Sequence, residues 1–157
     1  MVARQARGGA AMAGNAEGAR RLWEEIFPAM DLEAVAEIVS ADAVDHTARP
    51  GEPHGVEGVR NTMRFLDAAF SNQRFEIHRT IEEGDTVAIH FTHSGQHTGP
   101  IMGIEPTARE FAYQHIHILR FEEGRMVEHW GIHDHLDFMQ QLGALPRRPQ
   151  PVGADRS

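Results

Sequence analysis

Cysteine and lysine are both missing from this chain of 157 residues. The lack of cysteine excludes disulfides, thiol catalysis and thiolate metal sites. All fifteen basic residues are arginine, and the lack of lysine excludes Schiff-base chemistry, attachment of pyridoxal phosphate and a Walker-type phosphate lysine. The few serines lie in no nucleophile-elbow pattern. Covalent catalysis is therefore not expected.

Positive charge and long apolar runs are also scarce. The formal net charge is −8, whereas binding to the phosphates of nucleic acid needs a basic surface, so we expect no nucleic acid partner. No apolar run approaches the roughly 18 residues of a membrane helix, and no signal peptide is visible. We therefore expect no membrane partner and a cytoplasmic location.

The two ends of the chain lack the patterns of folded segments. Residues 1–15 carry arginines without an apolar stretch, and residues 147–157 are rich in proline and polar residues. We expect both to be disordered, as a leader and a tail. The intervening residues 16–146 show no internal repeat and no linker, and their number suits one domain with its own core.

The spacing of apolar residues predicts helices first and strands afterwards. Helices are expected over 16–30, over 31–40 with Asp31 as N-cap, over 56–70, and over 135–145 with Gly143 as C-cap. Strands are expected over 42–46, 75–82, 86–93, 110–121 and 125–133. This order predicts an α+β fold in which a curved antiparallel sheet wraps around the N-terminal helices and leaves a ligand pocket between them.

Several motifs follow one another at characteristic distances. They are "SADAVDHTARPGEPHGVEGVR", "GQHTGPIMGIEPTAREF", "HILRFEEGRMVEHW" and "DFMQQLGAL". Their joint order, over residues from about 17 to 146, resembles the SnoaL-like polyketide cyclase family, which has the nuclear-transport-factor-like cone fold shared with ketosteroid isomerase. The resemblance implies an enzyme without a cofactor that closes a ring in an aromatic polyketide by intramolecular aldol condensation.

The same resemblance implies where the active-site residues fall. The family's acid/base aspartate, late in the last strand, falls on Gly131; its neighbouring-strand histidine falls on His117 and its adjacent glutamine position on His115. The aspartate at the entry to the last helix is present as Asp134. Since glycine cannot move a proton, we expect His117, His129 and Asp134 to carry out the catalytic proton transfers.

Some relatives in this family also lack the aspartate and have been linked to the hydroxylation of polyketides. Two other interpretations therefore stay open. One is a different enzyme on the same scaffold, such as a hydroxylation partner, a dehydratase or a hydrolase. The other is a protein that binds a small molecule such as a polyketide without converting it.

Histidine is the abundant residue with chemical capacity, with eleven in the chain. The two-residue period of a strand puts His115 and His117 on one face, and His129, Gly131 and His133 on one face of the next strand. If these faces line the pocket, as the resemblance implies, four imidazoles converge there. A single strand histidine is usually a hydrogen-bonded structural residue. Four on facing sides favour a chemical role for at least one, because imidazole gains and loses protons near neutral pH.

Substrate binding is assigned to residues around the same pocket. Asp45 and His46 lie near the mouth loop, where they form either a plain turn or a place from which the carboxylate orients a histidine. His97 in "GQHTG" is either an exposed loop residue or part of the pocket rim, and Gly131 makes room for a bulky substrate. The full set is Asp45, His46, His97, His115, Gly131 and His133.

One stretch, "HIHILRFE", places Glu122 five residues after a His-x-His pair, which resembles the metal motif of cupins. The glycines that flank that motif are absent, and the leading helices do not suit a cupin. We therefore expect neither a metal nor any other cofactor. Arg120 and Glu128 point away from the supposed pocket, which favours a cross-strand ion pair over a catalytic role.

The opposite face of the same strands carries large apolar residues, namely Ile116, Ile118, Trp130 and Ile132. If they are exposed, these side chains form an apolar patch of the kind that usually marks an interface. We therefore expect a homodimer or a homotetramer, with a small polyketide-like molecule as the substrate.

Overall fold

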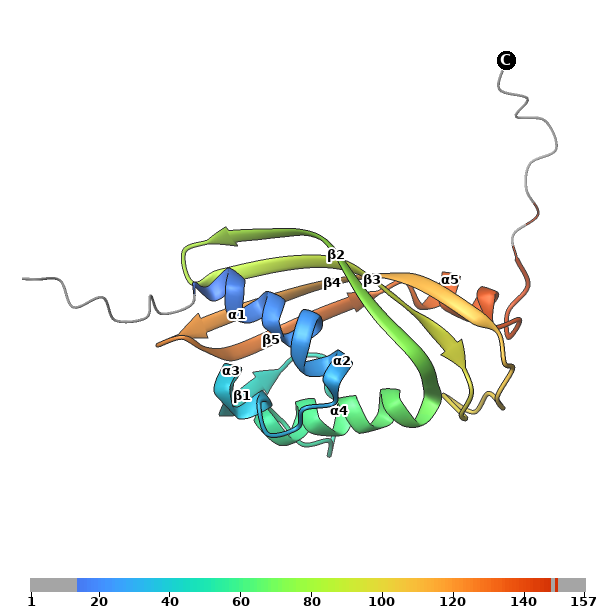
Figure 1. Cartoon of the computed structure of the whole chain (residues 1–157), viewed down its shortest axis with the longest axis horizontal. Coiled ribbons are helices and arrows are strands. Elements are labelled where there is room, and N and C mark those ends of the chain that lie inside the picture. The colour runs from blue at the N-terminus through green and yellow to red at the C-terminus, as the bar shows by residue number, and fades with distance from the viewer. Residues whose placement is uncertain (1–13, 148, 150–157) are drawn as a thin grey trace, which may run out of the picture.

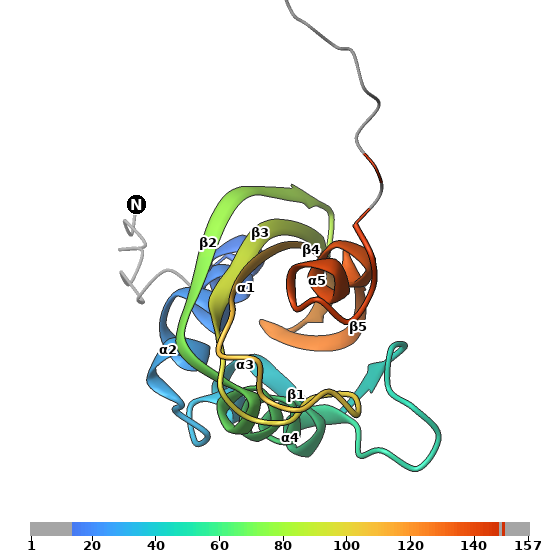
Figure 2. The ribbon, with the colours of Figure 1, turned by 90° about the vertical axis from the view of Figure 1, so that its right-hand side faces the viewer.

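The structure is a computed structural model in which residues 14–147 and 149 are described. One curved, unclosed sheet has the strand order β1-β5-β4-β3-β2, and the N-terminal helices pack on its concave side (Figure 1 and Figure 2). The strands are β1 (Val39–Asp45), β2 (Phe70–Glu83), β3 (Thr86–His97), β4 (Glu110–Glu122) and β5 (Arg125–His133). The predicted α+β fold, with a sheet curved around N-terminal helices, is confirmed.

The N-terminal helical run packs an apolar stripe against the sheet. It comprises α1 (Asn15–Arg21), a π-helical turn η1 (Leu22–Ile26) and α2 (Phe27–Ala29), which together cover most of the range predicted as one helix. Leu22, Trp23 and Ile26 are buried and belong to the larger of two apolar clusters. The π-helical turn was not predicted, because the spacing of these three residues fits either kind of turn.

The second predicted helix is shorter than expected. α3 spans only Val35–Ile38, although the Asp31 carboxylate accepts a hydrogen bond from the Ala34 amide at 3.1 Å, as at a helix start. From Val39 the chain is strand, because β1 pairs with β5 through Val39 and Met126. This pairing is parallel, so the sheet is antiparallel in all but one of its strand pairs.

The loop after β1 is held against that strand where α4 (Gly55–Ala69) begins. Gly55 has a φ of +62°, and a Cβ atom there would lie 2.1 Å from the carbonyl oxygen of Ala41, so only glycine fits. The Asp45 amide also donates a hydrogen bond to His54 Nδ1 at 3.1 Å. These contacts fix the position of Asp45 relative to the loop that follows it.

β4 alternates between buried and more exposed side chains along its length. Its odd-numbered residues face the helices and its even-numbered residues face outward. The antiparallel register aligns the inward rows of neighbouring strands, with His115 opposite His133 and His117 opposite Gly131. Imidazole side chains are therefore concentrated on the inward face of β4 and β5.

A second apolar cluster lies where α5 (His135–Gln141) packs against β4, around Phe70, Phe111 and Phe138. α5 is shorter than the predicted helix over 135–145. As expected, Gly143 follows its end, with a φ of +77° that suits a glycine after a helix. Members of both apolar clusters line the cavity described below.

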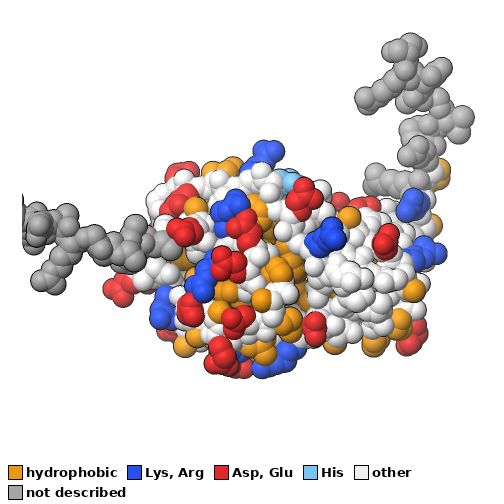
Figure 3. Space-filling view, in the orientation of Figure 1, with side chains coloured by type: hydrophobic (Ala, Val, Ile, Leu, Met, Phe, Trp, Pro, Cys, Tyr) orange, Lys and Arg blue, Asp and Glu red, His pale blue; other side chains and the backbone are white. Residues whose placement is uncertain are grey.

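The predicted leader (1–15) and tail (147–157) lie outside the described residues except for positions 14, 15, 147 and 149, and α1 already begins at Asn15. In the part of the chain that the structure describes, no helix is long and apolar enough to cross a membrane. Charged side chains of both signs are interspersed over the face in Figure 3, with apolar side chains between them. Some of these charges form ion pairs along the N-terminal helical run, as Arg20 of α1 does with Glu24 of η1.

Candidate functional site

A cavity of about 480 Å³ is lined by residues of the helices and of the concave face of the sheet. This volume is in the range of small-molecule sites. Most of the lining is aromatic or aliphatic, including Trp23, Phe27, Phe65, Phe75, Phe91 and Phe138. Polar side chains come from the end of β1 and the loop that follows it, from α4, and, as a group of imidazoles, from β4, β5 and the start of α5. The cavity therefore offers a bulky apolar ligand one chemically active wall.

Five histidines line this wall. His115 and His117 come from β4, His129 and His133 from β5, and His135 from the start of α5. The structure thus brings together the four strand histidines that the strand period placed on these faces, and it adds His135. Their rings are in contact, since the His117 ring centroid lies 4.9 Å from that of His129 and 5.2 Å from that of His133.

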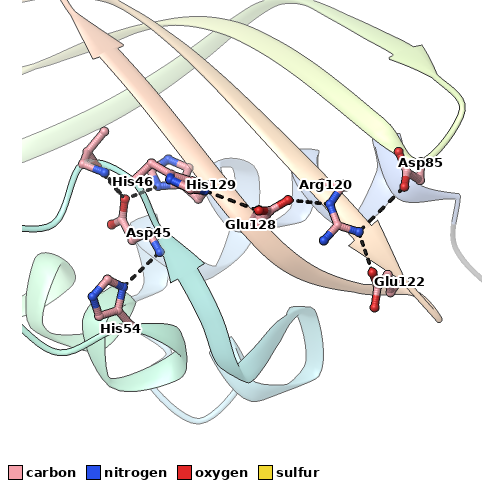
Figure 4. A network of polar contacts seen from close by, with 9 residues as sticks. Asp45, His46, His54, Asp85, Arg120, Glu122, Glu128 and His129 are labelled. Atoms are coloured by element: carbon pink, nitrogen blue, oxygen red, sulfur yellow. Dashed lines mark hydrogen bonds and ion pairs between the residues drawn. The ribbon is translucent and has the colours of Figure 1, made fainter.

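A line of hydrogen bonds connects Asp45, the last residue of β1, with His117 in the cavity wall. Asp45 Oδ1 lies 3.0 Å from His129 Nδ1, and His129 Nε2 lies 2.7 Å from His117 Nδ1. Figure 4 shows Asp45 and His129 meeting from neighbouring strands. Because an ionised carboxylate only accepts hydrogen bonds, a neutral His129 donates through Nδ1 and accepts through Nε2. His117 then donates through Nδ1 and keeps the lone pair on its Nε2.

Asp45 is held in its ionised form by its surroundings. Burial raises its pKa, but the hydrogen bonds from His129 and Thr47 together outweigh burial and hold the pKa below the usual range. The amide and the hydroxyl of Thr47 donate to Asp45 Oδ1 at 2.8 Å and 2.6 Å. A negative charge therefore lies at the outer end of the line, within hydrogen-bonding distance of His129 Nδ1.

The inner histidines are held neutral by burial. Burial, with smaller contributions from neighbouring histidines, lowers the pKa of His117 well below its ordinary value, that of His115 to about 2 and that of His133 to about 4. One nitrogen of each of these rings lies within 4.8 Å of the other two. A neutral imidazole has a lone pair available for a proton or a metal ion. The wall therefore presents unprotonated nitrogen atoms close together.

Gly131 lies between the two central imidazoles. A Cβ atom built on it would lie 3.2 Å from His117 Nδ1 and 3.3 Å from His129 Cε1. Gly131 lies within β5 and does not have a positive φ. The glycine is therefore explained by space and not by backbone conformation. A side chain at this position would compete with the two imidazoles for the same place.

Asp134 lies apart from this wall. Its side chain is exposed and accepts a hydrogen bond from the Asp137 amide at 3.0 Å, which makes it the N-cap of α5. It is not among the residues that line the cavity. The catalytic role expected for Asp134 stays a prediction, and the contacts observed are those of a helix cap.

Three residues expected to bind substrate are not among those that line the cavity, namely His46, His97 and Gly131. His46 stacks on Trp130 with ring centroids 4.5 Å apart, and its Nε2 lies 3.4 Å from Glu128 on the outer side of the sheet (Figure 4). His97 is fully buried, and its Nδ1 lies 2.9 Å from the Thr107 hydroxyl. The interpretation of His97 as an exposed loop residue is therefore wrong, because β3 continues to this position.

The predicted cross-strand ion pair is confirmed, with Arg120 Nε 2.5 Å from Glu128 Oε2 (Figure 4). Arg120 also pairs with Glu122 at 2.5 Å. Glu122 is on the outer face of β4, whereas His115 and His117 are on its inner face. The three positions that resemble a cupin motif therefore do not form one site.

Two polar residues of the wall were not proposed from the sequence. His135 is the first residue of α5, where no strand period points to it. Tyr113 shares the inner face of β4 with His115, and this parity was the signal that placed it there. Burial raises the pKa of the Tyr113 phenol, so its hydroxyl stays protonated and is available as a hydrogen-bond donor.

Known proteins resemble this chain in both sequence and structure. A family model described as SnoaL-like polyketide cyclase matches residues 17–142. The nogalonic acid methyl ester cyclase of Streptomyces nogalater is 29% identical over 98 residues, which are 62% of this chain and 73% of that protein. IdmH of Streptomyces antibioticus, a proposed polyketide cyclase, has a TM-score of 0.72 and 31% identity over 83% of this chain and 99% of its own. AclR of Streptomyces galilaeus, a proposed hydroxylase, has a TM-score of 0.74 and 26% identity over 89% of this chain and 87% of its own.

Proposed function

The chain belongs to the SnoaL-like polyketide cyclase family, and we propose that it closes a ring in a polyketide ester by acid/base chemistry without a cofactor. The base in this proposal is His117, supported by His129 and Asp45. The reaction is an intramolecular aldol ring closure. Relatives are named as cyclases of nogalonic acid methyl ester and of aklanonic acid methyl ester. These names suggest the methyl ester of an aromatic polyketide acid as the substrate class.

One observation supports this proposal above the others. The line of hydrogen bonds from Asp45 through His129 to His117 reaches the cavity wall beside Gly131. By resemblance, position 131 is where the family has its acid/base aspartate. The two imidazoles fill the space that a side chain at 131 would enter. They are therefore the groups best situated to move the proton that a glycine cannot.

The low pKa of His117 explains why this residue needs His129 and Asp45 in order to act as a base. An imidazolium ion at His117 would be buried without solvent, which is costly. When His117 Nε2 takes a proton and Nδ1 passes another to His129, the positive charge ends next to the Asp45 carboxylate. Asp45 is thus a positioning residue that stabilises charge, and His117 is the group that touches the substrate.

The proposed reaction conserves every atom of the substrate. His117 removes a proton from a carbon that lies between two carbonyl groups, and this carbon attacks a ketone carbon of the same molecule. A C–C bond forms while the C=O π bond breaks, and the resulting alkoxide takes up the proton that the pair of His117 and His129 accepted from carbon. Tyr113, on the same wall, is a donor for the developing negative charge on the enolate oxygen.

The direct test is to incubate the purified protein with nogalonic acid methyl ester in the presence of a chelator and to analyse the product by mass spectrometry. We expect an isomer of unchanged mass that His117→Gln forms far more slowly. A product with one more oxygen atom would instead indicate a hydroxylase, the activity proposed for AclR. Tight binding of the ester without any conversion would contradict an enzyme and favour a binding protein.

We further propose that identical chains associate through the outer face of β4 and β5. Ile116, Ile118 and Ile132 are exposed there, and Ile132 retains 74% of its accessible surface. Ile116 and Ile132 lie opposite each other, so this aliphatic patch is continuous across two strands and suits a second copy of itself around a twofold axis.

Light scattering at micromolar concentration tests this association. Ile132→Arg should reduce the mass to that of one chain. Leu145→Arg changes an exposed leucine that follows α5 in the sequence and is not part of β4 or β5, and it should leave the oligomer intact. A wild-type protein with the mass of one chain would contradict the proposal.

A further inference from the structure

We propose that His115, His117 and His133 form a site for one divalent transition-metal ion such as Zn²⁺, and that the bound ion blocks the proton transfer assigned to His117. The first part stands on geometry alone, and the second rests on the proposed function. His115 and His117 lie two residues apart on β4, and His133 lies opposite His115 on β5. The three imidazoles therefore converge from adjacent strands, and the third donor is one that the His-x-His pattern does not reveal.

The distance between the two β4 imidazoles suits a shared ion better than a hydrogen bond. His115 Nδ1 and His117 Nε2 are 3.4 Å apart, beyond the range of about 2.7–3.2 Å in which an N–H group bonds well. Two ligands of a tetrahedral zinc ion, each about 2.0–2.1 Å from the metal, lie about 3.3–3.4 Å apart. A nitrogen of His133 is within 4.8 Å of both, and this ring is partly exposed at the end of β5 and lines the cavity.

The hydrogen bonds of the wall leave the required nitrogen atoms available. His117 uses Nδ1 for its contact with His129, so the lone pair on Nε2 is free to bind a metal. His115 Nε2 is buried and has no hydrogen-bond partner among the residues that the structure describes. No hydrogen bond at Nε2 therefore competes for the His115 ring, which packs between Phe91 and Tyr113.

The surroundings of the three donors select a class of ion. His129 and Asp45 lie behind His117 as a histidine–carboxylate pair, which orients a metal ligand and partly balances the charge of the ion. A donor set made only of imidazole nitrogen disfavours Mg²⁺ and Ca²⁺, which prefer oxygen ligands. It suits Zn²⁺ and its neighbours in the first transition series.

An ion at this site would occupy the lone pair that accepts the substrate's proton in the proposed reaction. The Nε2 atom of His117 cannot hold a metal ion and a proton at the same time. We therefore expect the protein to turn over its substrate without a metal and to be inhibited reversibly by Zn²⁺. The site is in this sense an inhibitory one and not a cofactor site.

Binding is measured first and without substrate, by titrating Zn²⁺ into the untagged protein in competition with a chromophoric chelator. We expect one ion per chain. His115→Gln and His133→Gln should each weaken binding by at least about 100-fold, since even the loss of an outer contact costs about 10–100-fold. Co²⁺ in the same place should show the visible absorption of a tetrahedral ion, and His133→Gln should abolish it.

Two matched variants control for adventitious binding to other histidines. His135→Gln removes an imidazole of the same wall whose ring centroid is 5.1 Å from that of His133. His90→Gln removes one on the outer face, next to His78. Both should bind Zn²⁺ like the wild type. No binding at all, or binding that survives in His115→Gln and His133→Gln, would overturn the site.

The inhibitory part has its own measurement, with nogalonic acid methyl ester as the substrate. Saturating Zn²⁺ should stop most of the turnover, and a chelator should restore it. Faster turnover with Zn²⁺ would overturn the inhibitory part, because the ion would then assist the reaction. If the ester is not converted under any condition, the proposed function fails, and the Zn²⁺ titration still decides whether the site exists.

Discussion

Two groups of buried or half-buried histidines in this protein look alike until their contacts are compared. The cavity group comprises His115, His117, His129 and His133, and the core group comprises His93 and His97 of β3. Burial lowers the pKa of His93 to about 3 and that of His115 to about 2, with smaller contributions from other histidines, so the shift does not distinguish the groups. Greater burial does not mark the cavity group either, since His93 and His97 are the more completely buried.

The contacts of the two groups differ in what they allow chemically. His93 stacks on Phe75 with ring centroids 4.5 Å apart, contacts Gln73 at 3.0 Å and does not line the cavity. His117 lines the cavity and is linked through His129 to a carboxylate. The cavity provides a substrate from which a proton can come, and the carboxylate stabilises the charge that results. These two contacts, more than a perturbed pKa, mark a catalytic histidine.

The largest expected effect comes from changing one histidine of each group to glutamine. His117→Gln should lower turnover of the polyketide ester by about 10²–10⁴-fold, because general acid–base catalysis typically contributes that much. Glutamine keeps much of the volume and the hydrogen bonding, so ligand binding measured by fluorescence titration should persist. His93→Gln should turn over at a rate near that of the wild type, because His93 reaches neither the cavity nor the carboxylate.

Thermal melts of both variants show whether a loss of turnover follows from a loss of fold. The distinction between the two groups breaks down if His93→Gln, still folded at the assay temperature, loses as much turnover as His117→Gln. It also breaks down if both variants keep the activity of the wild type, since His117 would then have no part in the reaction.

A second prediction concerns the negative charge of Asp45, which is hydrogen-bonded to His129. Asp45→Asn keeps an oxygen that accepts from His129 but removes the counter-ion of the transferred proton. We expect kcat to fall by about 10²-fold, the size of a lost electrostatic contact in a catalytic site, with KM little changed. Asp42→Asn is the matched control, because Asp42 is also a β1 carboxylate with a hydroxyl partner, in Ser40, and lies outside the cavity lining. A change in KM alone would indicate that Asp45 only shapes the cavity mouth.

The side on which residues of one strand lie was predictable from the sequence. Contacts between strands that are far apart in the sequence were not. Alternation along β4 predicted the inward row because burial repeats every two residues in a strand. The helix predicted over 31–40 was too long, since the apolar spacing of Leu32, Val35 and Ile38 does not reveal that Val39 pairs with β5. Helical spacing is a weak signal when a long-range pairing competes for the same residues.

The same limit applies to the candidate site. His115 and His117 were placed correctly on one face because they lie on one strand. The link between Asp45 and His129 joins β1 to β5, and from the sequence a plain turn at Asp45 was the favoured alternative. His97 was misjudged because the glycines of "GQHTG" are typical of an exposed loop, whereas in the structure the His97 ring packs on Phe70.

Acid should destabilise the protein in part through the core group. His93 faces His115 and Tyr113, and His133 also lowers its pKa. Unfolded histidine binds a proton below a pH of about 6.5, whereas folded His93 stays neutral down to a pH of about 3. Between these values the unfolded state binds more protons, so the free energy of unfolding falls as the pH falls, by about 1.4 kcal/mol per pH unit for each such histidine.

His93→Gln isolates this contribution from those of the other ionisable groups. Denaturant melts from pH 6.5 to pH 4, with a chelator present, should give a slope that is shallower in the variant by about 1.4 kcal/mol per pH unit. Exposed His78→Gln serves as the control and should keep the slope of the wild type. Equal slopes in His93→Gln and the wild type would show that His93 takes up its proton over the same pH range in the folded and the unfolded state, contrary to its burial.

The smallest expected effect comes from one added methyl group at Gly131. The new Cβ atom would lie 3.2 Å from His117 Nδ1 and 3.3 Å from His129 Cε1, closer than the about 3.5–4.0 Å of ordinary contacts. The His117 ring is packed against Trp23 and Phe91, with centroids 4.8 Å and 5.2 Å away, so it yields only by a few tenths of an ångström. A misplacement of about 1 Å can cost about 10²-fold, and we therefore expect Gly131→Ala to lower turnover about tenfold without loss of fold. Steady-state kinetics beside a thermal melt measure both. Turnover equal to that of the wild type would mean that the spacing of the two imidazoles does not control the reaction, and Gly131→Asp would then show whether a carboxylate at this position works in their place.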